Sequence, residues 1–112
     1  MEEEDMAVDE KRTVNVAVQV LPLVEDVFGV VDKAIEAIDR SGVKYEVGPM
    51  ETVMEGQLDE LLEVAKQAHL ACLEAGAGQV MTIIKIGDNT CGTTIEEKVG
   101  KYRQAGVERG DG

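Results

Sequence analysis

Three glutamates gather in one short segment of the chain and are the side chains best suited to binding or catalysis. Glu46, Glu51 and Glu55 lie within residues 45–56 (YEVGPMETVMEG), with Thr52 between them. Carboxylate and hydroxyl oxygens accept hydrogen bonds, so this cluster suits a ligand that presents N–H groups or positive charge. Glutamates that simply face solvent on a strand would give the same pattern, and that alternative stays open.

The other reactive side chains form no recognisable catalytic or metal site. His69 has no second histidine or cysteine at ligand spacing, and Cys72 continues an apolar helical stripe, so both favour structural roles. Cys91 is expected in an exposed loop, but no neighbour in sequence would activate its thiolate. The glycines of residues 76–78 follow a helix and precede a strand, the reverse of a phosphate-binding loop.

We therefore predict no catalytic residue, no metal and no cofactor, and we expect that the protein is not an enzyme. An enzyme that uses two of the glutamates as acid and base would need both carboxylates to converge on one cavity in unequal environments.

The glutamate cluster must be positioned by a strand hairpin. Gly48-Pro49 is a turn dipeptide, and it separates residues 43–47, in which apolar and polar residues alternate, from residues 51–55, which are predicted to return as a second strand. Residues 45–56 are therefore predicted to form a tight β-hairpin that helps to build a small-molecule site.

The remaining elements follow from hydrophobic periodicity. Residues 14–21 alternate as a strand, with four valines on one face and Gln19 on the other. Helical spacing from Val27 leads to a stop at Ser41-Gly42, and a second helix follows Gly56. Residues 79–86 are almost continuously apolar, which predicts a central strand covered on both faces.

This βαββαβ order predicts an α+β, ferredoxin-like fold, with a four-stranded antiparallel sheet and both helices on one face. A short C-terminal helix is expected over residues 95–104, after a sequence that resembles a capping box. We expect one domain over residues 13–105, a disordered acidic tail over 1–12 and a loose tail over 106–112.

Composition narrows the class of partner. The formal net charge of −12 opposes binding to nucleic acid and favours a cationic ligand. No apolar run approaches the ~20 residues of a membrane span, and the acidic N-terminus differs from a signal peptide, so a cytoplasmic protein is expected. The helix-free face of the sheet carries apolar groups such as Ala17 and Leu21, so we expect another subunit to cover it.

The chain resembles the YkoF-related thiamine-binding family over about residues 14–86. The resemblance rests on VAVQVLPL around residues 17–23, on DELLEVAKQAH at 59–69 and on VMTIIKI at 80–86. Its most specific part is the pattern S-G-x-x-Y-x-x-G-P-x-x-T-x-x-E-G of residues 41–56.

The resemblance implies a ferredoxin-like homo-oligomer, a dimer through the sheet face and often a tetramer, that binds thiamine or its hydroxymethylpyrimidine part between subunits. The ligand-binding residues that it implies, together with the neighbouring walls, are Gln19, Tyr45, Pro49, Met50, Thr52 and Glu55. The alternative function is a structural or regulatory oligomer with no small-molecule ligand, in which the sheet face serves assembly alone.

Overall fold

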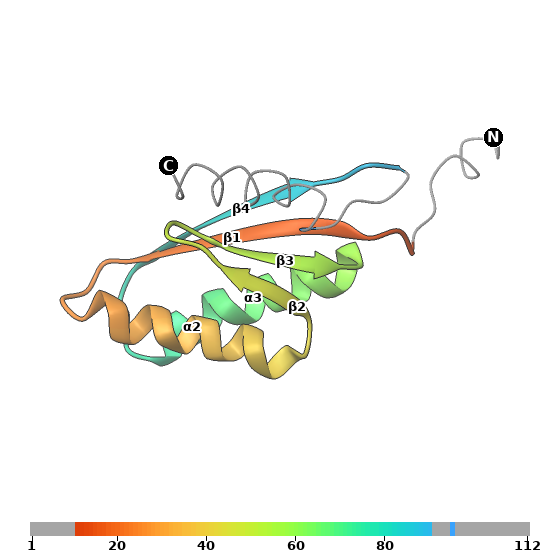
Figure 1. Ribbon diagram of the computed structural model, residues 1–112. Helices are drawn as coiled ribbons and strands as arrows, with labels where there is room; N and C mark the ends of the chain where they lie inside the picture. Colours follow the sequence, from red (N-terminus) through yellow and green to blue (C-terminus); the bar gives the residue numbers. More distant parts are fainter. Residues whose placement is uncertain (1–10, 91–94, 96–112) are drawn as a thin grey trace, which may run out of the picture.

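Four antiparallel strands form one sheet, and two helices lie on the same face of it (Figure 1). The computed structural model describes residues 11–90 and residue 95. The elements in chain order are β1 (Val14–Pro22), α2 (Val27–Ser41), β2 (Lys44–Val47), β3 (Thr52–Gly56), α3 (Leu58–Glu74) and β4 (Val80–Gly87). The strand order across the sheet is β2-β3-β1-β4. The predicted ferredoxin-like βαββαβ fold is confirmed.

Three predictions fall largely or wholly outside the described residues. These are the acidic tail over residues 1–12, the C-terminal helix over 95–104 and the loose tail over 106–112. Within them, residues 11 and 12 are described, and Ile95 is helical and buried.

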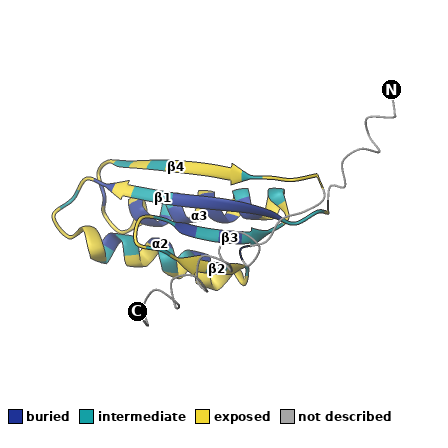
Figure 2. Cartoon of the chain, turned by 45° about the horizontal axis from the view of Figure 1, so that its top comes forward, coloured by how far each residue is buried: buried dark blue, intermediate teal, exposed yellow. Residues whose placement is uncertain are grey.

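The core lies between β1 and the two helices. Val14, Val16 and Val18 point from β1 toward the helices and are at most 4% exposed. They meet small and medium apolar side chains of α2 and α3 in one cluster, which includes Ala34, Ile38, Leu61, Ala65, Ala68 and Cys72. Figure 2 shows this buried layer under the sheet. Small residues on α3 let that helix approach the sheet closely, so the helix-side face of β1 is covered at Val14, Val16 and Val18 and partly covered at Val20.

Local signals at both ends of α2 explain its boundaries. The Asp26 carboxylate accepts a hydrogen bond from the Gly29 backbone N–H at 3.1 Å, which caps the N-terminus. A side chain at Gly29 would place its Cβ 2.2 Å from an Asp26 oxygen, so it would displace the capping carboxylate. Gly42 ends the helix in the left-handed region, with φ of 84°, as the sequence predicts.

The hairpin of β2 and β3 forms where it is predicted. Glu46 lies opposite Val53 and Val47 opposite Thr52, and the Gly48 N–H donates to the Glu51 carbonyl oxygen at 2.9 Å across the turn. Because strand residues alternate between faces, the hairpin glutamates share the helix-free face of the sheet.

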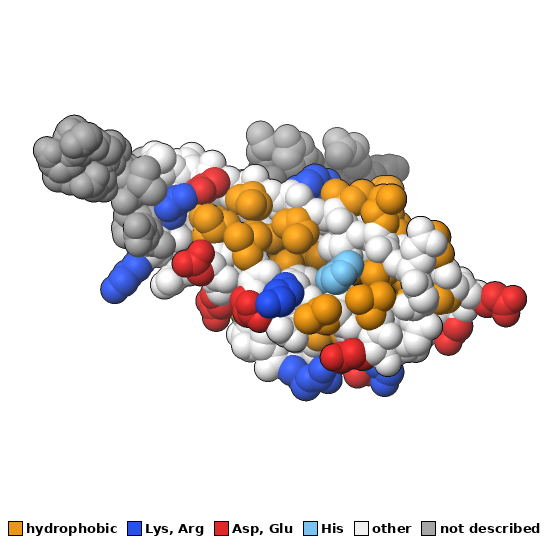
Figure 3. Space-filling view, turned by 180° about the vertical axis from the view of Figure 1, so that it is seen from behind, with side chains coloured by type: hydrophobic (Ala, Val, Ile, Leu, Met, Phe, Trp, Pro, Cys, Tyr) orange, Lys and Arg blue, Asp and Glu red, His pale blue; other side chains and the backbone are white. Residues whose placement is uncertain are grey.

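β4 is an edge strand, so the prediction of a central strand covered on both faces is wrong. Among the described strands it pairs with β1 alone, and four of its apolar side chains are 40–62% exposed: Met81, Ile83, Ile84 and Ile86. Figure 3 shows hydrophobic side chains gathered around His69, which contacts Thr82 of this strand. A continuous apolar run in a strand indicates that both faces of the strand are covered. It does not specify whether this chain or a second chain covers them.

An ion pair joins two neighbouring strands at one end of the sheet. It links Arg12, which precedes β1, to Asp88, which follows β4. The hydrogen bonds and charge of the Arg12 guanidinium hold the pKa of the Asp88 carboxyl below its ordinary value. A carboxyl with a lowered folded-state pKa stabilises the fold at pH values above its unfolded pKa. That stabilisation is lost as the pH falls through the folded-state pKa.

We therefore expect the melting temperature of the wild type to fall more steeply in acid than that of Asp88→Asn. Thermal denaturation monitored by circular dichroism between pH 7 and pH 2 measures this difference. Parallel curves for the two proteins over the whole range would contradict the prediction.

None of the helices in the described part of the chain is long and apolar enough to cross a membrane.

Candidate functional site

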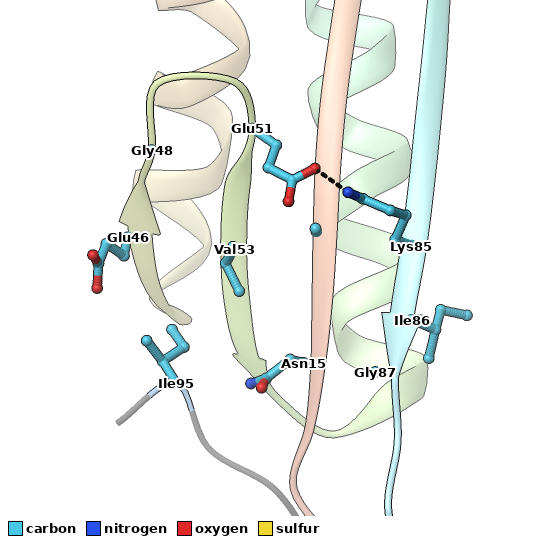
Figure 4. A pocket seen from close by; sticks show the side chains of 10 residues that line it. Asn15, Glu46, Gly48, Glu51, Val53, Lys85, Ile86, Gly87 and Ile95 are labelled. Carbon is cyan, nitrogen blue, oxygen red and sulfur yellow. Dashed lines mark ion pairs between the residues drawn. The ribbon is translucent and has the colours of Figure 1, made fainter. Parts of the chain in front are cut away.

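A hollow of about 340 Å³ opens on the helix-free face of the sheet, and we call it the open-face hollow (Figure 4). This volume lies within the range of small-molecule sites, about 300–1,000 Å³. The residues that line it come from all four strands, from the turn between β2 and β3, and from Ile95. They include Asn15, Ala17, Glu51, Val53 and Lys85.

The floor of the open-face hollow is apolar and is set by strand register. Ala17 on β1 lies directly between Val53 on β3 and Lys85 on β4. The short Ala17 side chain leaves room above the central strand, and Ile95 forms an apolar wall at one end of the hollow. A flat, partly apolar ligand therefore has a surface on which to lie.

Asn15 supplies a buried polar group at that end of the hollow. Its side chain is directed toward the space between Val53 and Ile95 (Figure 4), and the residue is only 2% exposed. The amide nitrogen donates to the Val14 carbonyl oxygen at 3.3 Å, whereas Oδ1 has no hydrogen-bond partner among the described residues. A buried carbonyl without a partner costs about 1–3 kcal/mol, so a donor that reached this oxygen, which is exposed by less than 1 Å² in the ligand-free chain, would stabilise it.

An ion pair spans the other end of the open-face hollow. The Lys85 Nζ lies 2.8 Å from a carboxylate oxygen of Glu51, and the two side chains meet above β1 (Figure 4). Glu46 lines the hollow from the hairpin, but its side chain points outward from β2. The hollow thus combines an amide, a carboxylate and an ammonium around an apolar floor.

Glu55, a predicted ligand-binding residue, lies on the same face beside Asn15 but does not line the open-face hollow. Its carboxylate accepts a hydrogen bond from the Ile95 backbone N–H at 2.8 Å. The Lys44 ammonium is 3.7 Å from its other oxygen. The contacts seen here give Glu55 a positioning role, because it fixes Ile95 at the edge of the hollow.

A second hollow, the hairpin groove, lies between the β2–β3 turn and α2 and measures about 310 Å³. Four of the predicted site residues line it, namely Gln19, Pro49, Met50 and Thr52. Phe28 and Met50 border it with 83% and 74% exposure, whereas Thr52 is buried. The groove is therefore mainly apolar. Of the other two predicted residues, Glu55 lies on the open face and Tyr45 on the helix side of β2, so none of the six lines the open-face hollow.

Tyr45 lies on the helix side of β2, away from the open-face hollow. Its hydroxyl donates to the Asp39 carboxylate on α2 at 2.9 Å. This hydrogen bond, with partial desolvation and the negative charge of Asp39, raises the pKa of Tyr45 above its ordinary value. The contact joins β2 to α2.

The histidine and the described cysteine occupy structural positions. His69 Nδ1 lies 2.6 Å from the Thr82 hydroxyl and links α3 to β4. Cys72 is buried in the core, and burial raises the pKa of its thiol. Cys91 lies outside the described residues. Over residues 11–90 and 95, no group of three or more His, Cys, Asp or Glu side chains is placed to hold a metal ion.

The sequence points to the hairpin but does not single out Asn15 or the ion pair of Glu51 with Lys85. In the sequence, Asn15 is one of several residues that alternate with valines, which is also the pattern of a residue facing solvent. The one available signal is that it is a short amide on a strand whose other open-face residues are Ala17, Gln19 and Leu21.

The fold defines a small ferredoxin-like protein with a hollow on the helix-free face of its sheet. The chain belongs to the thiamine-binding protein family, whose model matches residues 16–103. It is 56% identical over 93 residues to a UPF0045 protein of Clostridium perfringens, covering 81% of this chain and 98% of that protein.

Solved structures show the same fold. The DUF77 domain from Bacillus cereus is 52% identical, with a TM-score of 0.78, and the match covers 82% of this chain and 91% of that one. A Thermotoga maritima protein named for thiamine biosynthesis or salvage is 40% identical, with a TM-score of 0.74, covering 80% of this chain and 98% of that one. The predicted membership of a thiamine-binding family is confirmed.

Proposed function

We propose that this protein binds thiamine or its hydroxymethylpyrimidine moiety in the open-face hollow and catalyses no reaction. Membership of the thiamine-binding family supports the ligand class. The observation that carries the location is the buried Asn15 Oδ1, which has no partner among the described residues and is directed into the hollow.

The chemistry of the Asn15 amide matches an aminopyrimidine. A carboxamide presents a carbonyl acceptor and an N–H donor side by side, and an aminopyrimidine presents an exocyclic amine beside a ring nitrogen. In protein–DNA complexes, asparagine recognises adenine through an equivalent pair of hydrogen bonds, to its exocyclic amine and a ring nitrogen. In this protein the Asn15 nitrogen has a second hydrogen beyond the one donated to Val14, so both bonds can form.

The spacing along β1 suits the second ring of thiamine. Neighbouring open-face positions on one strand lie about 7 Å apart, so a ring joined to a pyrimidine at Asn15 would lie over Ala17 and Val53. That position is next to the Glu51 carboxylate. The acidic protein and this carboxylate would favour the positive charge of a thiazolium ring.

A second copy of the chain would cover the open face and enclose the site. Leu21, Met81 and Ile83 lie on this face and are 36%, 62% and 40% exposed. Such a group of exposed apolar side chains is typical of an interface. We therefore place the ligand near a subunit boundary of a homo-oligomer.

The second candidate function is a structural or regulatory oligomer without a ligand. The exposed Phe28 and Met50 beside the hairpin groove favour it, because they offer an additional apolar contact surface away from the open face. This alternative predicts a stable assembly whose stability does not respond to thiamine.

Calorimetric titration of the wild-type oligomer with thiamine and with hydroxymethylpyrimidine tests the proposal. We expect saturable heat and a rise in melting temperature with both ligands, because a ligand that binds only the folded state stabilises it. The matched control is an analogue with a carbonyl oxygen in place of the exocyclic amine, which should bind at least tenfold more weakly. Absence of heat and of any melting shift at millimolar concentration of both ligands would support the ligand-free alternative.

A further inference from the structure

We infer that Lys85 sets how strongly the open-face hollow prefers a cationic ligand over a neutral one. This inference rests on the proposed function and concerns the end of the hollow opposite Asn15. There, the Lys85 ammonium neutralises the Glu51 carboxylate that a positively charged ring would otherwise approach.

The geometry places the ammonium at the level of the second ring. Lys85 lies directly opposite Ala17 in the register of β1 and β4, and its Nζ reaches across β1 to Glu51 at 2.8 Å. Figure 4 shows the two side chains meeting above the central strand. A ring that lies over Ala17 must therefore share its space with this ion pair.

The ion pair between Lys85 and Glu51 can open at little cost in free energy. The Lys85 side chain is 64% exposed and that of Glu51 is 27% exposed, and an ion pair at this exposure adds little net stability. Lysine carries a compact, strongly hydrated charge on a flexible stem, so its ammonium can move out to water without disturbing β4. A neutral pyrimidine at Asn15 leaves the pair intact, whereas a thiazolium ring must displace the ammonium from Glu51.

Two substitutions change this balance in opposite directions. We expect Lys85→Gln to raise the affinity for thiamine about tenfold, because it uncovers the Glu51 carboxylate at a few ångströms from the cationic ring. Glu51→Gln should lower that affinity about tenfold, because Lys85 then repels the ring. Neither substitution should change the affinity for neutral hydroxymethylpyrimidine by more than about twofold.

Lys44→Gln is the matched control, since it makes the same change in net charge on the same face. The Lys44 side chain is 62% exposed, and its carboxylate partner is Glu55, which does not line the hollow. We expect Lys44→Gln to change the affinity for thiamine less than twofold. Circular dichroism and elution volume establish that each variant keeps its fold and assembly.

The ratio of the two affinities separates the possible results. Binding of hydroxymethylpyrimidine with an unchanged ratio in Lys85→Gln would overturn the role of Lys85 and leave the proposed function standing. An equal rise in Lys85→Gln and Lys44→Gln would also overturn it, since the effect would then come from net charge alone. Failure of both ligands to bind the wild type would overturn the proposed function together with this inference.

Discussion

Asn15→Leu is expected to weaken the binding of both thiamine and hydroxymethylpyrimidine about 100-fold while the protein stays folded. The reason is that the substitution removes the one buried side-chain acceptor that is left without a partner among the described residues. Loss of two hydrogen bonds of about 1–1.5 kcal/mol each corresponds to an affinity reduced about 100-fold. Calorimetric titration of the variant with each ligand measures the loss.

Stability distinguishes a binding role of Asn15 from a structural one. Leucine is close to asparagine in shape and removes a buried carbonyl that lacks a partner, so the free energy of unfolding should stay level or rise by about 1–2 kcal/mol. Chemical denaturation of the ligand-free protein tests this. A large loss of stability would show that Asn15 serves the fold rather than a ligand.

Gln19→Leu is the companion variant, because Gln19 lines the hairpin groove and lies outside the open-face hollow. We expect it to bind both ligands within about threefold of the wild type. The opposite result, in which Gln19→Leu loses binding and Asn15→Leu keeps it, would place the ligand in the hairpin groove.

The fold could be predicted from the sequence because its signals are local. The alternation of valines on β1 and the turn at Gly48-Pro49 each depend on a few neighbouring residues. The left-handed end of α2 at Gly42 is equally local. Once these elements are assigned in order, the handedness of the connections leaves few arrangements other than the ferredoxin-like one.

Strand order and exposure depend on contacts between distant residues, and this explains the error about β4. The same apolar run would suit a central strand or an edge strand that a second copy covers. The register that pairs Val16 with Ile86 joins residues 70 positions apart, and nothing within residues 80–87 specifies it.

The site was only partly predictable for the same reason. The hairpin glutamates are recognisable from their spacing, but Glu51 meets Lys85 only because β3 and β4 both flank β1. Asn15 is buried in a hollow whose wall includes Ile95, 80 positions away. A short amide beside three valines gives no local indication of such burial.

Ile83→Glu should convert the proposed oligomer into monomers that retain their secondary structure. Ile83 is 40% exposed on the open face of β4, opposite Gln19, so a carboxylate there costs the isolated chain little. In a dimer formed through this face, two such carboxylates would be buried close together without partners, which costs several kcal/mol. Light scattering coupled to size-exclusion chromatography measures the molar mass, and circular dichroism reports the fold.

Ile86→Glu makes the same change on the same strand but on the opposite face. Ile86 borders the open-face hollow, but it pairs with Val16 of the helix-side face, is 49% exposed, and its side chain extends out past the edge of the sheet (Figure 4), so this variant should keep the wild-type mass. If Ile86→Glu dissociates the assembly and Ile83→Glu does not, the subunits meet through the helix side of β4, and the open-face hollow faces solvent. If Ile83→Glu alone dissociates the assembly and also weakens thiamine binding, the covering subunit helps to enclose the ligand. Binding weakens in that case because water reaches the ligand in the monomer, and its hydrogen bonds with Asn15 are then weaker than in the enclosed site.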